Sequence, residues 1–150
     1  MIKEITNLNE ALSLIEKSYL ENIKDEDTIN GQKTFINEFL YSNETINEYK
    51  NMQMKIFGYY INNNLAGVIS INKNNYIKFL FVDKKYLNKG IGRKLLDYIV
   101  SITPPNTKIT LDSSLSSKDF YIKYGFIQKS DVLQMNEMKY IEMEYQIWKN

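Results

Sequence analysis

The sequence contains no cysteine and no histidine among its 150 residues. Their absence excludes disulfide bonds, thiolate nucleophiles, Ser-His-Asp triads, histidine bases and the usual zinc sites. Catalysis must therefore use tyrosine, serine, threonine, lysine, carboxylates or backbone groups, and we predict no metal site. A chain of this length, with 43% hydrophobic residues, can bury a full core without cross-links, so we expect one domain over residues 1–150.

The sequence also lacks a large excess of either charge and any long apolar run. The 19 basic residues, of which Arg93 is the only arginine, nearly balance 18 acidic residues. That balance is unlike the basic surface of nucleic-acid-binding proteins. No apolar stretch approaches the ~20 residues that cross a bilayer, and the N-terminus has no apolar signal core. We therefore expect a cytoplasmic protein with neither a nucleic-acid nor a membrane partner.

The apolar pattern predicts an α/β fold with a mixed, mostly antiparallel central sheet flanked by helices. Helical spacing and period-two alternation mark the elements, and Asn62-Asn63-Asn64 between two β-branched runs indicates a hairpin. Residues 76–82 form an apolar run typical of one strand that is buried on both faces. The expected order is strand 2–5, helix 9–19, a helix near 35–40, strands 54–61, 65–71 and 76–82, a helix with apolar positions from Ile91 to Ile102 that Pro104-Pro105 ends, strand 108–111, helix 116–124, and strands 126–130 and 139–148.

Two glycines, Gly90 and Gly92, lie in the turn between strand 76–82 and the helix that follows. Such a turn presents unpaired backbone N–H groups and the positive end of the helix dipole, which can hold a phosphate or pyrophosphate. Three side-chain cations lie at the same place: Lys89, Arg93 and Lys94. The turn therefore indicates a phosphorylated ligand. The alternative is that the glycines only relieve a tight connection.

Two common nucleotide motifs do not match this turn. The dinucleotide fingerprint requires a third glycine where Leu95 stands, and the P-loop requires a Gly-Lys-Ser/Thr that is lacking. A second motif follows downstream, Phe120-Tyr121-Ile122-Lys123-Tyr124-Gly125-Phe126. With Gly90-Ile91-Gly92 and the order of the elements, it makes the sequence resemble the GNAT-type N-acetyltransferase superfamily. The resemblance is strong over residues 76–127 and is an outline before Met54.

The resemblance implies transfer of an acetyl group from acetyl-CoA to a primary amine, which attacks the thioester directly in a ternary complex. A backbone amide at the acetyl-pantetheine arm would stabilise the developing oxyanion. Amides from Asn88 to Arg93 would hold the pyrophosphate. The residues that the resemblance implies for cofactor binding are Leu80, Phe81, Val82, Leu87, Asn88, Lys89, Gly90, Ile91, Gly92, Arg93, Ser114 and Phe120.

Three positions depart from the family pattern. Leu87 stands where glutamine or arginine is usual, Ser114 where asparagine is common, and Ser117 where alanine is common. Lys89 or Arg93 could supply the charge that Leu87 lacks, because backbone amides do most of the holding. The Leu87 departure also motivates an alternative function, a non-catalytic acyl-CoA-binding or regulatory domain on the same fold. A purely structural domain, which would bind no CoA, is the third reading.

Tyr121 is the catalytic residue that the resemblance implies. A neutral phenol beside the sulfur can act as general acid toward the departing CoA thiolate. The alternative is that Tyr121 is a core aromatic, since aromatics on helices that cover a sheet are usually buried. Tyr124, one turn later, is expected to serve packing.

The general base and the acceptor stay open in the sequence. No carboxylate lies within residues 76–82, where some family members place a glutamate base. Asp112 is a candidate for a base that acts through water, and other carboxylates could line the acceptor side or simply be solvated: Glu38, Glu44 and Glu48. If the family layout holds, residues 24–52 cover the acceptor pocket. The acceptor is then a small-molecule or peptide amine, and a homodimer is an expectation of the resemblance alone.

Overall fold

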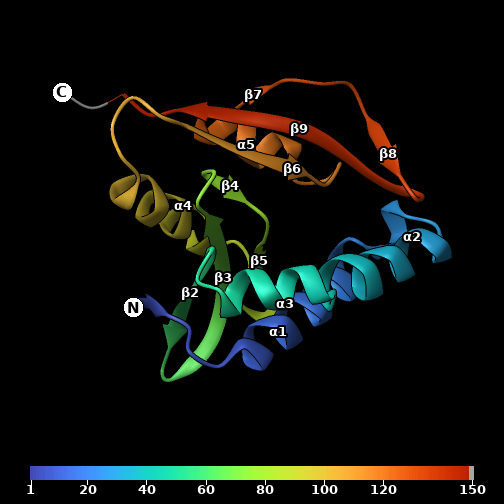
Figure 1. Cartoon of the computed structure of the whole chain (residues 1–150), viewed down its shortest axis with the longest axis horizontal. Helices are drawn as coiled ribbons and strands as arrows, with labels where there is room; N and C mark the ends of the chain where they lie inside the picture. The colour runs from blue at the N-terminus through green and yellow to red at the C-terminus, as the bar shows by residue number, and fades with distance from the viewer. Residues whose placement is uncertain (149–150) are drawn as a thin grey trace.

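Residues 1–148 are described by a computed structural model, so the last two residues of the expected domain lie outside the described part. Two sheets and the helices around them make up the fold (Figure 1). The first sheet is antiparallel, in the order β1 (Ile2–Glu4), β2 (Met54–Ile61), β3 (Asn64–Asn72) and β5 (Leu80–Val82). The second has the order β4 (Tyr76–Ile77), β6 (Lys108–Ser113), β9 (Met138–Gln146) and β7 (Ile127–Gln128), and β8 (Leu133–Met135) also pairs with β9.

Only the β4–β6 pair is parallel among the pairs of residues 1–148. The predicted fold class, a mixed and mostly antiparallel α/β arrangement, is therefore confirmed. The predicted hairpin is confirmed as well. Asn62 and Asn63 turn the chain between β2 and β3 with φ values of 49° and 67°, a left-handed conformation that asparagine tolerates.

Side chains satisfy the first amides of several helices. Asn7 accepts the amide of Glu10, and Ser42 caps a later helix in the same way. None of the helices in the described part of the chain is long and apolar enough to cross a membrane. The helices are α1 (Leu8–Asn22), η1 (Lys24–Glu26), α2 (Ile29–Lys33), the π-helix η2 (Thr34–Leu40), α3 (Asn43–Lys50), η3 (Lys84–Tyr86), α4 (Ile91–Ile102) and α5 (Lys118–Tyr124).

Two apolar clusters hold these layers together. One packs α1 and η2 against the first sheet and includes Leu12 and Val68, both at most 1% exposed. The other includes Leu95 of α4, Ile69 of the first sheet and Ile109 of the second, each fully buried. Because this second cluster draws on both sheets, it packs the two sheets against each other.

The expected continuous strand over residues 76–82 is wrong. The chain forms β4, leaves the strand at Lys78 and Phe79, and re-enters as β5 in the other sheet. At the break, the amide of Phe79 donates to the hydroxyl of buried Ser70 at 2.9 Å, and the amide of Ser70 donates to the carbonyl of Phe79 at 2.9 Å. The Ser70 hydroxyl thus replaces a backbone acceptor and lets the strand change sheets.

Replacing Ser70 by alanine should therefore destabilise the protein. The change leaves the buried amide of Phe79 without its acceptor, which costs about 1–3 kcal/mol. Urea unfolding of the wild type and the Ser70→Ala variant measures this difference. Ser101→Ala, in the exposed part of α4, is the matched control and should change the free energy of unfolding by less than about 0.5 kcal/mol. If the two variants were equally stable, the Ser70 hydroxyl would not stabilise the strand break.

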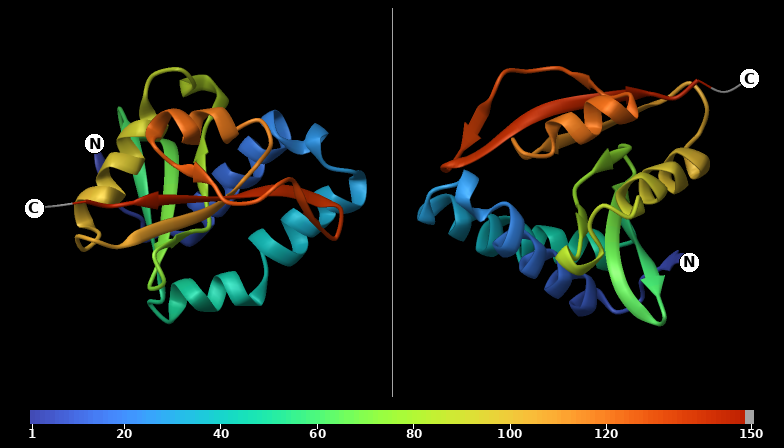
Figure 2. Two further views of the ribbon diagram at one scale, coloured as in Figure 1. Left: turned by 90° about the horizontal axis from the view of Figure 1, so that it is seen from above. Right: turned by 180° about the vertical axis from the view of Figure 1, so that it is seen from behind.

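A hairpin that the sequence did not indicate closes one end of the molecule. Strands β8 and β9 are joined by Asn136 and Glu137, whose φ values are 48° and 65°, and the turn reaches α2 (Figure 2). The hydroxyl of Thr28 donates to the Glu137 carboxylate at 3.1 Å, and that of Thr34 donates to the Asn136 carbonyl at 3.2 Å. Gly31 lies so close to the Glu137 carbonyl that a Cβ would collide with it. The hairpin is therefore fixed onto α2.

Candidate active site

An open groove of about 660 Å³ follows β5 and the N-terminus of α4, and we call it the outer groove. The structure places most of the residues expected to bind cofactor in its wall. Two differ in position: Lys89 does not line the groove, and Ser114 lines a neighbouring cavity, where its hydroxyl donates to that of Ser117 at 2.9 Å. The expected residues in the wall are Leu80, Phe81, Val82, Leu87, Asn88, Gly90, Ile91, Gly92, Arg93 and Phe120.

The N-terminus of α4 presents free amides to the outer groove. Gly90 caps the helix with a φ of 76°, a left-handed conformation that favours glycine, and no side chain caps the helix. The first intrahelical bond runs from the Lys94 amide to the Gly90 carbonyl, so the amides of Ile91, Gly92 and Arg93 have no partner within the helix. With the helix dipole, these amides form a site suited to a phosphate or pyrophosphate.

The φ angle of Gly92 is not positive, so backbone conformation does not explain why glycine occupies this position. A Cβ on Gly92 would lie 3.1 Å from Cζ of Phe120, and both residues line the outer groove. Arg93 also lines the groove, with its guanidinium 5.7 Å from the ring centroid of Tyr124. Leu87 is 41% exposed there and contributes no charge. Backbone amides and the Arg93 guanidinium are thus among the polar groups offered to an anion at this turn.

The free edge of β5 points other backbone groups into the outer groove. The amide of Ser70 bonds to Phe79, and the amide of Asp83 bonds to the Ala66 carbonyl at 2.8 Å. Hydrogen-bonded and non-hydrogen-bonded positions alternate along an antiparallel pair of strands. The backbone groups of Phe81 therefore face β3, as those of Phe79 and Asp83 do, and the amides of Leu80 and Val82 point away from β3. The Val82 carbonyl already accepts the Ser18 hydroxyl at 3.1 Å.

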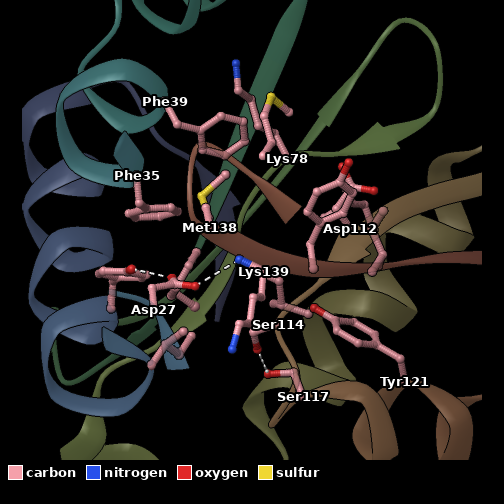
Figure 3. A pocket seen from close by; sticks show the side chains of 18 of the residues that line it. Asp27, Phe35, Phe39, Lys78, Asp112, Ser114, Ser117, Tyr121, Met138 and Lys139 are labelled. Atoms are coloured by element: carbon pink, nitrogen blue, oxygen red, sulfur yellow. Dashed lines mark hydrogen bonds between the residues drawn. The ribbon is translucent and has the colours of Figure 1, made fainter. Parts of the chain in front are cut away.

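Tyr121 lies where the outer groove meets a second cavity and lines both. Its ring is held edge-on between Phe120 and Phe126, with centroids at 5.2 and 5.4 Å, and its hydroxyl points into the second cavity (Figure 3). Burial raises the pKa of the Tyr121 phenol above its ordinary value of about 10, so the hydroxyl stays protonated at neutral pH. Tyr121 is therefore a neutral hydrogen-bond donor.

Tyr124 has a different environment. Its hydroxyl donates to Asp97 of α4 at 2.7 Å, and its ring packs on Tyr145. Burial and the Asp97 carboxylate raise its pKa. It lines neither the groove nor the cavity, so the structure gives it the packing role that the sequence assigned to it.

The second cavity, which we call the inner cavity, has a volume of about 120 Å³. Its walls come from segments far apart in the sequence: the end of α1, the loop after η1, η2, β4, β6 and the β8–β9 hairpin (Figure 3). Phe35 and Phe39 of the π-helix form one wall, and Met138 of the hairpin forms another. The inner cavity and the outer groove share five residues: Ile23, Leu80, Phe81, Ser117 and Tyr121.

Of the carboxylates proposed as bases, Asp112 lines the inner cavity. Its carboxylate accepts the Tyr76 hydroxyl at 2.9 Å, and Glu142 is its partner across the β6–β9 ladder. Partial desolvation raises the pKa of Asp112; the Tyr76 hydrogen bond opposes that rise and the Glu142 charge adds to it. Residues 1–148 contain no group of three or more carboxylates that could hold a metal ion.

The other proposed bases lie elsewhere. Glu38 and Glu44 are exposed and do not line the inner cavity. Glu48 forms an ion pair with Lys78 at 3.4 Å, and it also accepts the Asn72 side-chain amide at 3.2 Å. Glu48 therefore neutralises a cavity lysine, and its carboxylate is engaged with these two partners.

One cavity carboxylate, Asp27, was not singled out in the sequence. It is 9% exposed and lines the inner cavity. It accepts the Tyr19 hydroxyl at 2.6 Å and the backbone amide of Lys139 at 2.9 Å. Its only sequence signal was its place in residues 24–52, where it was one charge among several.

Comparison with known proteins supports the family that the motifs suggested. Residues 19–147 match the family model described as an acetyltransferase (GNAT) domain. A curated relative, the uncharacterized N-acetyltransferase YafP of Escherichia coli (strain K12), is 35% identical over 52 residues, which cover 35% of this chain and 33% of YafP. The match thus spans about a third of that relative's length. Because the family model matches most of the chain, the protein belongs to the GNAT acetyltransferase family.

Solved structures share the fold at low sequence identity. A GCN5-related N-acetyltransferase from Rhodopseudomonas palustris superposes with a TM-score of 0.79 at 15% identity, covering 98% of this chain and 95% of that one. PaiA N-acetyltransferase from Thermoplasma acidophilum, solved with coenzyme A, gives 0.70 at 17% identity, covering 97% and 99%. At these identities the likeness supports the fold alone.

Proposed function

We propose that the protein transfers the acetyl group of acetyl-CoA to a primary amine, which attacks the thioester directly in a ternary complex. The observation that carries the proposal is the meeting of two spaces at one tyrosine. The outer groove and the inner cavity share Tyr121 and the free edge of β5. A donor in the groove and an amine in the cavity would thus come together there.

Acetyl-CoA suits the outer groove in shape and charge. The free amides of Ile91, Gly92 and Arg93 would hold the pyrophosphate, with Arg93 adding a cation. The pantetheine arm would follow β5 past Phe120 toward Tyr121. The PaiA structure, which shares the fold, was solved with coenzyme A, and this supports a coenzyme A ligand for the present chain.

The reacting groups follow from that placement. The Leu80 amide points away from β3 into the groove and can donate to the thioester oxygen as it becomes an oxyanion. The amine nitrogen forms the new C–N bond, the C–S bond breaks, and one N–H proton ends on the CoA sulfur. Tyr121 donates a hydrogen bond to the departing thiolate. Its raised pKa favours that donation over complete proton transfer, since a thiol has a pKa near 8.5.

An acceptor amine is mostly an ammonium ion at neutral pH and must lose one proton before it attacks the thioester. Asp112 is the cavity carboxylate best placed to accept that first proton through water. If it does, kcat should fall as the pH drops through its pKa, which burial places above the ordinary value of about 3.9. Asp112→Asn should lower kcat roughly tenfold or more and abolish this acidic limb. Glu142→Gln is the control: removing a neighbouring negative charge lowers the pKa of Asp112, so the limb should move to lower pH. An unchanged profile in Asp112→Asn would exclude this role.

Acetyl transfer is tested directly by mass spectrometry of small primary amines incubated with acetyl-CoA and the protein. We expect an acetylated amine together with one equivalent of free CoA thiol. Saturable binding of acetyl-CoA without a product across the amines would instead support the non-catalytic acyl-CoA-binding domain that Leu87 suggests. A folded protein that binds no acetyl-CoA would contradict both functions.

A further inference from the structure

Asp27 places a buried negative charge on the wall of the inner cavity. The loop after η1 carries it, and its carboxylate lies between Tyr19 of α1 and Lys139 of β9 (Figure 3). Lys139 offers its backbone amide at 2.9 Å, and no ion pair joins Asp27 to any cation within residues 1–148. A buried carboxylate is costly unless a cation or several hydrogen bonds compensate it.

The carboxylate of Asp27 keeps unused acceptor capacity. A carboxylate offers about four lone-pair positions, and Tyr19 and the Lys139 amide occupy two of them. Tyr19 in turn stacks on Phe35 with ring centroids 4.1 Å apart, so the group that holds Asp27 is itself fixed. The site is therefore a rigid, buried anion that can accept further hydrogen bonds from a cation inside the cavity.

Asp27 lies away from the place where acetyl transfer would occur. The residues common to the groove and the cavity include Leu80 and Tyr121 but not Asp27, which lines the cavity alone. Apolar side chains, among them Phe35 and Met138, form another part of the cavity wall. An amine that reacts beside Tyr121 would therefore extend a short apolar segment toward Asp27.

The other charges around the cavity favour a cation. Lys78 is paired with Glu48, and its ammonium points away from the cavity centre (Figure 3). Glu48, which lies outside the lining, neutralises Lys78, so the remaining charged lining residues, Asp27, Asp112 and Lys139, carry a formal charge of −1. The volume of about 120 Å³ suits a small amine.

We propose that the acceptor is a short aliphatic diamine, whose second ammonium group binds the Asp27 carboxylate while the first amine reacts beside Tyr121. This assignment rests on the proposed acetyl transfer and adds the substrate class. Asp27 is a specificity residue in this proposal: it binds the acceptor and takes no part in the bond changes. Its contribution to binding is the same before and during reaction, so it should act on KM more than on kcat.

The test compares putrescine and cadaverine with n-butylamine and n-pentylamine, and with the corresponding ω-amino acids. A charge-assisted hydrogen bond contributes on the order of ten- to hundredfold in binding. We therefore expect kcat/KM for the diamines to exceed that for the monoamines by at least roughly tenfold, with the ω-amino acids poorest. Asp27→Asn should bring diamines and monoamines within about twofold of each other through KM. Asparagine can keep both existing contacts, accepting from the Lys139 amide and donating to the Tyr19 hydroxyl.

Tyr19→Phe separates charge from position, because it removes one contact to Asp27 but keeps the carboxylate. We expect this variant to retain the preference for diamines. The proposal would be overturned if Tyr19→Phe lost the preference for diamines as completely as Asp27→Asn does. It would also be overturned if the wild type used diamines and monoamines equally well.

A binding measurement makes the inference independent of turnover. Cadaverine is titrated calorimetrically into the protein, with and without CoA. We expect saturable binding that Asp27→Asn loses. The absence of such binding by the folded wild type would overturn the diamine assignment even if monoamines are acetylated. Failure of the acetyl transfer itself would appear separately, as the absence of acetyl-CoA binding or of any acetylated amine.

Discussion

Tyr121→Phe should lower kcat about a hundredfold and change the acetyl-CoA dissociation constant by less than about twofold. The variant removes the hydroxyl, which points into the inner cavity, and keeps the ring between Phe120 and Phe126. A hydrogen bond to the leaving thiolate forms only as the C–S bond breaks, so its loss should raise the barrier and leave ground-state binding intact. Steady-state kinetics and calorimetric titration measure the two quantities.

Tyr124→Phe is the matched control for this result. It removes a hydroxyl of the same helix, which donates to Asp97 and lines neither space. We expect its kcat to stay within about threefold of the wild type, because an exposed hydrogen bond contributes only about 1 kcal/mol to stability. Equal losses in the two variants would show that Tyr121 acts through the packing of α5. An unaffected kcat in Tyr121→Phe would remove its catalytic role.

Gly92→Val should weaken acetyl-CoA binding by roughly a hundredfold or more, since it would cost at least one charge-assisted hydrogen bond to the pyrophosphate. A branched side chain on Gly92 would meet Phe120 and occupy the groove in front of the amides of Ile91 and Arg93. The fold should survive, because Gly92 has an ordinary helical conformation at an exposed end of α4. Calorimetric titration with acetyl-CoA measures the effect, and circular dichroism checks the fold.

Gly92→Ala provides a graded comparison. Its Cβ would lie 3.1 Å from Cζ of Phe120, the far end of a side chain that is 38% exposed and can shift slightly. The alanine variant should therefore lose less than about tenfold in affinity, corresponding to about 1.4 kcal/mol. Wild-type affinity in a folded Gly92→Val variant would place the pyrophosphate elsewhere and support the reading in which the glycines serve only the turn.

The sequence predicted the fold where the physical signal was local. The apolar positions with helical spacing from Ile91 to Ile102 lie on α4, and Asn62 and Asn63 turn the hairpin as expected. The sequence did not predict the break between β4 and β5, because an apolar run does not indicate which sheet its residues join. The acceptor for the Phe79 amide is a hydroxyl nine residues earlier, on Ser70.

The same distinction holds for the site. The outer groove is built largely from β5 and the turn into α4, which are contiguous in sequence, and most of its expected residues lie in its wall. The inner cavity is assembled from segments as distant as Tyr19 and Tyr140. In the sequence, Asp27 is therefore only one of three consecutive acidic residues. Its role depends on the fold, which places the backbone amide of Lys139 within hydrogen-bonding distance of its carboxylate.

A crystal structure of the protein with coenzyme A is the most direct test of the proposed active site. We expect the pyrophosphate on the amides of Ile91, Gly92 and Arg93, and the pantetheine arm along the free edge of β5. The sulfur should then lie within hydrogen-bonding distance of the Tyr121 hydroxyl, where the outer groove meets the inner cavity. Coenzyme A bound with its sulfur away from Tyr121, or outside the groove, would contradict the account.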